Sequence, residues 1–149
     1  MTTAPAGFAA VFAALFVAHQ IADHWVQTDQ QAARKGNPGW PGRRACAAHV
    51  ATYTVTAVLA LAALVAATGL PLAVGRLAAG LAVSAVTHFI ADRRTPLMRL
   101  AELVGVGRFY ALGTPRPGRD DNPSLGTGAY ALDQSFHYAW LFIAALIIA

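Results

Sequence analysis

Seven side chains that could bind a metal or move protons stand out in this sequence, and six of them form pairs with a fixed spacing. Three segments each hold a histidine and an aspartate four residues apart, and one more histidine stands alone: His19 and Asp23, His88 and Asp92, Asp133 and His137, and His49. In a helix, positions i and i+4 lie on the same face, so each pair would present both groups to one neighbour. Imidazole and carboxylate together suit Zn²⁺, Mn²⁺ or Fe²⁺. We expect the metal ligands to be His19, Asp23, His49, His88, Asp92 and His137.

The segments that must position these residues are apolar enough to be membrane helices. Of the 149 residues, 56% are hydrophobic and only 12% are charged, which is unlike an ordinary soluble domain. A membrane helix needs about 20 mostly apolar residues, and four runs qualify, at about 6–27, 45–67, 72–91 and 130–149. The sequence therefore predicts an all-α fold: one integral membrane domain over residues 1–149, built as a four-transmembrane-helix bundle.

The basic residues predict how the bundle sits in the membrane. The first long loop holds Arg34, Lys35, Arg43 and Arg44, and the loop after the third helix holds Arg93, Arg94, Arg99, Arg108, Arg116 and Arg119. Between the second and third helices, Thr68-Gly69-Leu70-Pro71 predicts a tight turn, with only Arg76 near that side. Because basic loops stay on the cytoplasmic side, we expect both loops inside and both termini outside a bacterial cytoplasmic membrane. The basic residues do not follow one helix face, so no nucleic-acid partner is expected.

This topology brings all seven groups to one depth. The first and third helices end with their His-Asp pairs, while His49, Asp133 and His137 lie near the starts of the second and fourth helices. An Asp at the centre of a bilayer costs roughly 2.5–3.5 kcal/mol, and metal coordination would offset that cost. Seven groups exceed one tetrahedral shell, so we expect one or two ions, with zinc favoured over manganese or iron.

The sequence also contains an internal repeat. His19-Gln-Ile-Ala-Asp23 matches His88-Phe-Ile-Ala-Asp92, and a helix with a histidine near its start follows each copy. This predicts a duplicated two-helix hairpin, with a pseudo-twofold axis along the membrane normal. Ala45 lies four residues before His49 where the fourth helix has Asp133. Because Asp133 has no counterpart in the repeat, we expect it to be the catalytic base.

Other polar residues near the cluster suggest a substrate site. Arg93 and Arg94 follow Asp92 directly and would suit a phosphate headgroup, and Gln27 and Gln134 could donate hydrogen bonds to a substrate. We therefore expect Arg93, Arg94, Gln27 and Gln134 to bind substrate. Tyr53 lies one turn from His49 and is expected to stabilise helix packing. A cytoplasmic loop is expected between the third and fourth helices. In it, residues 96–104 have the spacing of a short interfacial helix, and residues 113–128 are rich in Gly, Pro and Asp.

The ordered motifs resemble those of a known family. His19-x-x-x-Asp23 followed by Gln27, the helix-opening His49, His88-x-x-x-Asp92, and Asp133-Gln134-x-x-His137 resemble a family of small bacterial and phage membrane proteins of unknown function. The resemblance covers nearly the whole chain and implies a multipass membrane fold without an established reaction. More loosely, the layout is similar to inner-membrane proteins described as metal-dependent hydrolases. Many relatives have a Lys after the second Asp, where this chain has Arg93-Arg94.

Three functions are compatible with these residues. The first is a membrane-embedded metal-dependent hydrolase that acts at the cytoplasmic leaflet on a lipid or lipid-phosphate substrate. The second is a transporter or channel for metal ions or protons, and the third is a membrane assembly protein with a structural metal. The expected outer half holds no ionisable residue except Arg76, which favours the hydrolase over transport. The lipid bilayer is the one partner the sequence indicates; the oligomeric state has no signature in it.

Overall fold

A computed structural model of the chain describes residues 4–114 and 126–149, and the regular structure in these residues is helical. The helices are α1 (Ala4–Ile21), η1 (Ala22–Val26), α2 (Asp29–Arg34), α3 (Gly39–Thr68), α4 (Val74–Asp92), α5 (Thr95–Leu103), α6 (Gly107–Tyr110) and α7 (Gly128–Ile148). Four helical segments are long and apolar enough to cross a membrane: Pro5–Val26, Gly39–Thr68, Val74–Asp92 and Gly128–Ile148. The prediction of an all-helical chain with four candidate membrane spans is confirmed. Most of the loop expected at 113–128, with Arg116 and Arg119, lies outside the described residues.

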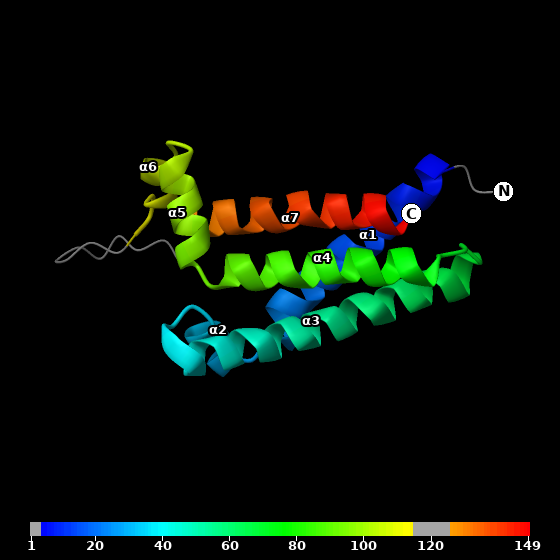
Figure 1. Cartoon of the computed structure of the whole chain (residues 1–149), viewed down its shortest axis with the longest axis horizontal. Coiled ribbons are helices and arrows are strands. Elements are labelled where there is room, and N and C mark those ends of the chain that lie inside the picture. The colour runs from blue at the N-terminus through cyan, green and yellow to red at the C-terminus, as the bar shows by residue number, and fades with distance from the viewer. Residues whose placement is uncertain (1–3, 115–125) are drawn as a thin grey trace.

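The four long helices form a bundle in which the two His-Asp repeats occupy opposite corners. α1 packs against α3 and α7, and α4 packs against the same two helices (Figure 1). The short helices α2, α5 and α6 gather at one end of the bundle, where α5 runs across the ends of α4 and α7 (Figure 1). The short helices therefore cover this end of the bundle.

The first span ends in an unexpected way. Its last turn, η1, is a π-helix rather than a continuation of the α-helix, and the backbone N–H of Gln27 donates to the carbonyl of Ala22 at 2.9 Å. Single π-turns are rare and occur frequently at functional sites. This turn carries Asp23, so it sets the direction in which that carboxylate leaves the helix.

The first long loop is shorter than the sequence predicted. α2 begins with a capping box between Thr28 and Gln31, and α3 starts at Gly39, six residues ahead of the predicted start at 45. Pro41 is compatible with that early start, because the first-turn N–H groups of a helix have no intrahelical partner. Arg43 and Arg44 therefore belong to a helix and not to a loop.

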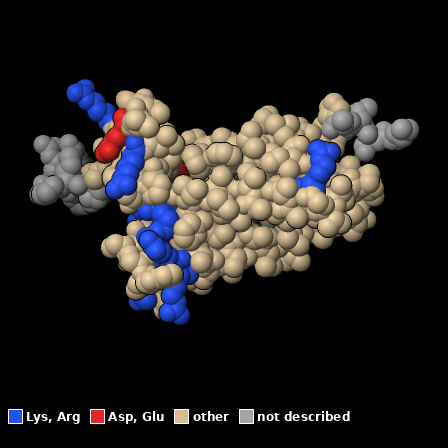
Figure 2. Space-filling view, viewed as in Figure 1, with Lys and Arg blue, Asp and Glu red and all other residues tan. Residues whose placement is uncertain are grey.

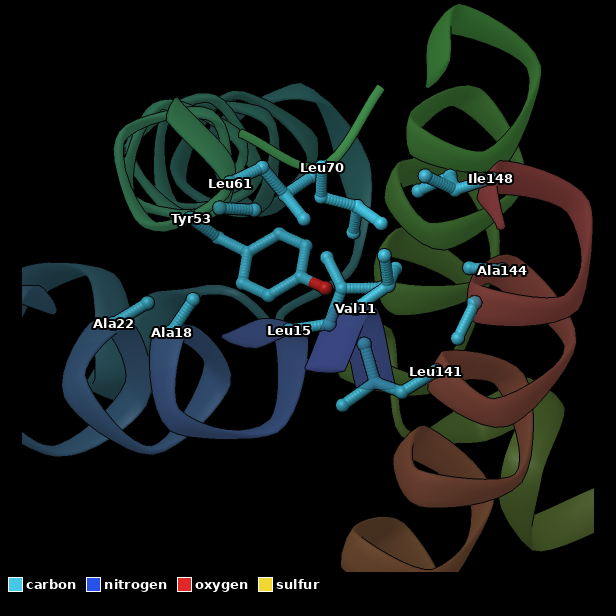
Figure 3. Close-up of a cluster of buried hydrophobic side chains, with 12 residues drawn as sticks. Val11, Leu15, Ala18, Ala22, Tyr53, Leu61, Leu70, Leu141, Ala144 and Ile148 are labelled. Atoms are coloured by element: carbon cyan, nitrogen blue, oxygen red, sulfur yellow. The ribbon is translucent and has the colours of Figure 1, made fainter. Parts of the chain in front are cut away.

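The end of the bundle away from α2 and α5 is apolar. Val11 and Leu15 from α1, Leu61 from α3, and Leu141 and Ile148 from α7 meet in one buried cluster (Figure 3). Gly80 lets α4 and α7 approach closely, because a Cβ there would lie 2.9 Å from the carbonyl oxygen of Ala144. Gly69 ends α3 with φ of 67°, a left-handed conformation that favours glycine, as the predicted turn requires.

The charged residues are divided unequally between the two ends. Arginine and lysine side chains crowd the end that carries the short helices, while the other end shows little blue (Figure 2). Arg76 at that other end donates from Nε to the carbonyl of Ile147 at 2.7 Å. It thereby satisfies a carbonyl at the end of α7, where intrahelical donors are lacking.

Candidate metal centre

The seven His and Asp side chains meet where α1, η1, α3, α4 and α7 converge. The side chains of His19, His49 and His88 are at most 1% exposed, and that of Asp92 is equally buried. Asp133 differs, because 27% of its side chain is exposed. The structure thus brings together every residue that the sequence predicted as a ligand, together with the expected base.

Asp23, His49 and His88 form the tightest group of possible ligands. The Nε2 atoms of His49 and His88 are 3.0 Å apart, and Oδ1 of Asp23 lies 3.3 Å from the first and 3.6 Å from the second. Zinc binds such atoms at about 2.0–2.2 Å, so two ligands of one tetrahedral ion lie about 3.3 Å from each other. The three atoms are therefore spaced like three corners of a zinc site.

Several atoms in the cluster lack the hydrogen bonds that buried polar groups need. Among the residues that the structure describes, buried atoms without a hydrogen-bond partner include Oδ1 of Asp23, Oδ2 of Asp92, Nε2 of His137 and both ring nitrogens of His19. Leaving such an atom unsatisfied costs about 1–3 kcal/mol. A divalent cation would satisfy several of them together, so the donor set fits a metal such as zinc.

The tautomer of His137 supports the same interpretation. Its Nδ1 lies 2.8 Å from the carbonyl oxygen of Asp133, and a carbonyl only accepts, so Nδ1 carries the hydrogen. In a neutral imidazole the other nitrogen, Nε2, then has a free lone pair. This arrangement is typical of metal-binding histidines, whose second nitrogen is held by a backbone carbonyl or a carboxylate.

Two further groups of possible ligands overlap the centre. Asp92, Asp133 and His137 have ligand atoms within reach of one ion, and so do His19, His88 and His137. The group of Asp92, Asp133 and His137 shares no residue with the group of Asp23, His49 and His88. The cluster therefore contains two triads without a common residue, although Oδ2 of Asp92 also lies 3.4 Å from Nε2 of His49 and 3.3 Å from Nε2 of His88. His19 contacts both triads, since its ring centroid is 5.4 Å from that of His88 and 4.8 Å from that of His137.

Sequence reasoning missed Lys35, which it assigned only to the charge of a cytoplasmic loop. The Nζ atom of Lys35 lies 2.7 Å from Oδ1 of Asp92, and only 13% of the lysine side chain is exposed. The loop between α2 and α3 folds back over the bundle end and inserts this ammonium beside the cluster. One signal was available, because Lys35 is the only lysine among eleven basic residues.

Arg93 and Arg94 hold that loop in place. Arg93 donates to the backbone carbonyls of Lys35 and Asn37, and Arg94 donates from Nη2 to the carbonyl of Ala32 at 3.2 Å. Gly42 leaves room for this contact, since a Cβ there would lie 2.0 Å from the Asn37 oxygen and 2.8 Å from Nη1 of Arg93. The two arginines, which were expected to bind substrate, thus both contact the loop.

A polar cavity of about 520 Å³ lies against the cluster at the basic end. Its walls include all three carboxylates and two cations, together with both predicted glutamines: Asp23, Asp92, Asp133, Lys35, Arg94, Gln27 and Gln134. Leu97 of α5, Tyr110 of α6, His24 and Tyr130 are also among the lining residues. Arg93 does not line this cavity, so of the two arginines only Arg94 faces it. A small charged ligand in the cavity would touch both acidic and basic groups.

Residues 11–149 match the family described as "Protein of unknown function (DUF3307)". The chain belongs to the DUF3307 family. Membership agrees with the expected resemblance to a family of unknown function. No curated protein and no solved structure matches the DUF3307 chain.

Tyr53 closes the centre of this DUF3307 chain on the side of the apolar core. Its ring centroid lies 4.1 Å from that of His88, and its hydroxyl is 2.5 Å from Oγ of Ser84. The hydroxyl has its own partner away from the imidazoles, so the aromatic face is what meets His88. Tyr53 thus contacts a candidate ligand directly, in addition to the packing role that the sequence predicted.

Proposed function

We propose that this chain is a membrane-embedded metal-dependent hydrolase, which acts at the cytoplasmic leaflet on a lipid or lipid-phosphate substrate. One observation carries the proposal: the polar cavity adjoins the Asp23, His49 and His88 triad and has acidic and basic side chains in the same wall. A buried structural ion would need no such cavity. A metal together with a cationic side chain beside it would suit a phosphate-bearing substrate.

The proposed orientation follows from the basic end of the bundle. The arginines around α2 and α5 favour the cytoplasmic side for this end (Figure 2), which would leave both termini outside a bacterial cytoplasmic membrane. α5 exposes Met98, Leu100 and Leu103 while it buries Leu97 and Ala101, as a helix lying in the membrane interface would. The cavity would then lie at the depth of the lipid headgroups.

The packing of the bundle also supports the proposed duplication. A twofold axis that exchanges α1 with α4 and α3 with α7 would pair the contact between α1 and α3 with that between α4 and α7. It would likewise pair the two remaining contacts, α1 with α7 and α4 with α3. All four contacts are present, and the two repeats of His-x-x-x-Asp lie on the exchanged helices. We infer that the centre arose between two copies of a helical hairpin.

Different residues of the chain would bind the metal and accept the proton during hydrolysis. Asp23, His49 and His88 would hold a divalent ion, whose chemistry when bound would be to lower the pKa of water to about 7. Asp133 is the most solvent-accessible of the three carboxylates and lines the cavity, so it is placed to accept a proton from the attacking water. In hydrolysis of a phosphate ester, the water oxygen bonds to phosphorus and the bond to the leaving oxygen breaks. The leaving oxygen then takes up a proton.

Substrate would be held by polar side chains that line the cavity. Arg94 can offer guanidinium hydrogens to phosphate oxygens, and Nε2 of Gln27 is a buried donor without a hydrogen-bond partner in the described chain. Gln134 is held differently, since its Oε1 accepts from the hydroxyl of Tyr138 at 3.0 Å and its Nε2 lies 3.4 Å from Oδ2 of Asp133. We assign Gln134 to orienting the base and Arg94 and Gln27 to substrate binding.

Transport is less well supported by the fold. Between the centre and the opposite bundle end lies the apolar cluster that includes Val11, Leu15 and Leu61, and Tyr53 closes the centre on that side. An ion crossing this layer would meet no ligand from the clustered His and Asp residues. The cavity, by contrast, lies at the basic end alone.

Purified protein in lipid nanodiscs would test the proposal. Zinc- or manganese-loaded protein should release phosphate or a headgroup from at least one anionic phospholipid, with phosphatidic acid as the first probe, and chelation should stop the release. Liposomes containing the protein and a metal-sensitive dye provide the comparison. Metal entry into liposomes without hydrolysis of any phospholipid class would replace the enzyme proposal with transport.

A further inference from the structure

We propose that Lys35 fills a second cation position in the centre, so that each chain binds one divalent ion and not two. The inference rests on the proposed metal centre and specifies how many ions that centre holds. It assigns to Lys35 a defined place beside the ligands, which the spacing of residues in the sequence did not indicate.

The two separate triads would otherwise suit two ions. One consists of Asp23, His49 and His88, and the other of Asp92, Asp133 and His137. In the second triad, Oδ1 of Asp92 is already bound by the ammonium of Lys35 at 2.7 Å. A second divalent ion would have to share that carboxylate with a positive charge a few ångströms away. Oδ2 of Asp92, which Lys35 does not bind, lies 3.4 Å from Nε2 of His49 and 3.3 Å from Nε2 of His88 and so faces the first triad. The lysine therefore competes with a metal for the second triad and not for the first.

The loop around Lys35 is built to keep the ammonium there. Arg93 donates to the carbonyls of Lys35 and Asn37, which lie on both sides of Gly36, and Arg94 fixes Ala32 one turn earlier. The backbone of Arg94 has φ of 59° and ψ of −51°, a conformation that non-glycine residues rarely adopt and that surrounding contacts must maintain. Three arginine contacts to backbone carbonyls thus restrain a loop whose one buried cation faces Asp92.

Charge balance agrees with a single ion. The three aspartates of the cluster carry three negative charges when ionised, Lys35 carries one positive charge, and a divalent ion carries two. The buried group is then neutral with neutral histidines, which is the condition that a low-dielectric surrounding favours. Two divalent ions together with Lys35 would leave an excess of two positive charges. Removal of the lysine charge would lower that excess and make the second triad available.

The experiment counts metal ions per chain in full-length protein held in nanodiscs. Protein is dialysed to equilibrium against Zn²⁺, and separately against Mn²⁺, and the bound metal is measured by mass spectrometry. We expect one ion for wild type and for Lys35→Arg, and an increase towards two for Lys35→Met and Lys35→Gln. The double variant Lys35→Met with Asp133→Asn should return to one, because the second triad then lacks a ligand. Arg99→Met removes an exposed positive charge from the same bundle end and should stay at one.

Each alternative outcome has a distinct meaning. Two ions in wild type, or one ion in both neutral Lys35 variants, would overturn the proposed role of Lys35. Neither result would contradict the proposal that the cluster binds metal. An increase that also occurs in Arg99→Met, or that persists in the double variant, would mean surface binding and would equally overturn it. No bound metal in wild type would remove the proposed function itself.

Discussion

The Nε2 atoms of His49 and His88 lie 3.0 Å apart, and each also lies 3.3–3.6 Å from carboxylate oxygens of Asp23 and Asp92. A neutral imidazole has one N–H group, so at most one nitrogen of this pair can donate to the other. A hydrogen bond between them would leave the donor with no hydrogen for either carboxylate. A cation bound by both nitrogens would instead accept all the lone pairs that converge here.

Loss of either of these histidines should therefore remove metal and stability together. We expect His49→Ala and His88→Ala to lower metal affinity by at least about 10- to 100-fold. Loss of a residue that only hydrogen-bonds to a metal ligand typically has an effect of this size, so loss of a ligand itself should cost at least as much. Because metal binding would tie three helices together, thermal stability should fall in the same variants. Metal content and unfolding temperature would be measured on the same preparations.

His24→Ala is the matched control, since His24 is exposed and its Nδ1 donates to the carbonyl of Gln20. This variant should keep its metal. Unchanged metal content in both His49→Ala and His88→Ala would remove the Asp23, His49 and His88 triad as a metal site.

Topology can be tested with reporters at the two bundle ends. A reporter fused after Ala149 should be outside the cytoplasm, and one inserted at Gly105, in the turn between α5 and α6, should be inside. Gly105 is suited to insertion, because its φ of 82° and open surroundings mark an exposed turn. Reversed signals at the two positions would move the centre to the outer leaflet and exclude a cytoplasmic substrate.

Gly80 should be the most sensitive small residue in the contact between α4 and α7. A Cβ there would lie 2.4 Å from Cγ1 of Ile148 and 2.9 Å from the Ala144 oxygen, so Gly80→Ala must push the helices apart. We expect a loss of about 1–3 kcal/mol of stability from this overpacking. Gly75→Ala is the control, because a Cβ there meets nothing within 4 Å. Equal unfolding temperatures in detergent for the two variants would contradict the close helix contact.

Gly42 offers a way to move Lys35 without changing its charge. A Cβ at Gly42 would lie 2.0 Å from the backbone oxygen of Asn37, so Gly42→Ala must displace the loop that carries the lysine. We expect the variant to fold less stably and to bind more than one ion per chain, as Lys35→Met should. Gly107→Ala meets only ordinary contacts with Glu102 and serves as control. A Gly42→Ala variant that is destabilised but still binds one ion would contradict this prediction. Displacement of the loop would then not change the number of ions bound per chain.

The sequence predicted the helices and the convergence of His and Asp because both follow from local spacing and from the cost of buried charge. His88 and Asp92, for example, share a helix face by their spacing alone, and their mostly apolar helix of 19 residues is long enough to cross a membrane. The start of α3 was misplaced because Gly39-Trp40-Pro41-Gly42 resembles a loop, although a proline in the first helical turn loses no hydrogen bond.

Lys35 could not be positioned from the sequence, because its place depends on contacts to backbone atoms. Arg93 and Arg94 bind carbonyls of the loop, and every residue type has a carbonyl, so no motif records the pairing. The π-turn at Asp23 was missed for a similar reason. It inserts no unusual residue type and alters only which backbone groups pair.

Asp133 provides the test that separates an enzyme from a structural metal centre. Its side chain lines the cavity and is 27% exposed, whereas the Asp92 carboxylate is 1% exposed and bound to Lys35. Asp133→Asn keeps the shape of the side chain but removes its basic oxygen. It should preserve folding and the single bound ion, and it should reduce turnover of the lipid substrate about 10²- to 10⁴-fold, the usual contribution of general acid–base catalysis. Leu132→Ala, beside it on a half-buried position of α7, is the control and should keep its turnover. If Asp133→Asn loses its metal as fully as His88→Ala, then Asp133 is a ligand and the proton must go elsewhere. If it hydrolyses lipid at the wild-type rate, Asp133 has no part in the chemical step, however close it lies to the cavity.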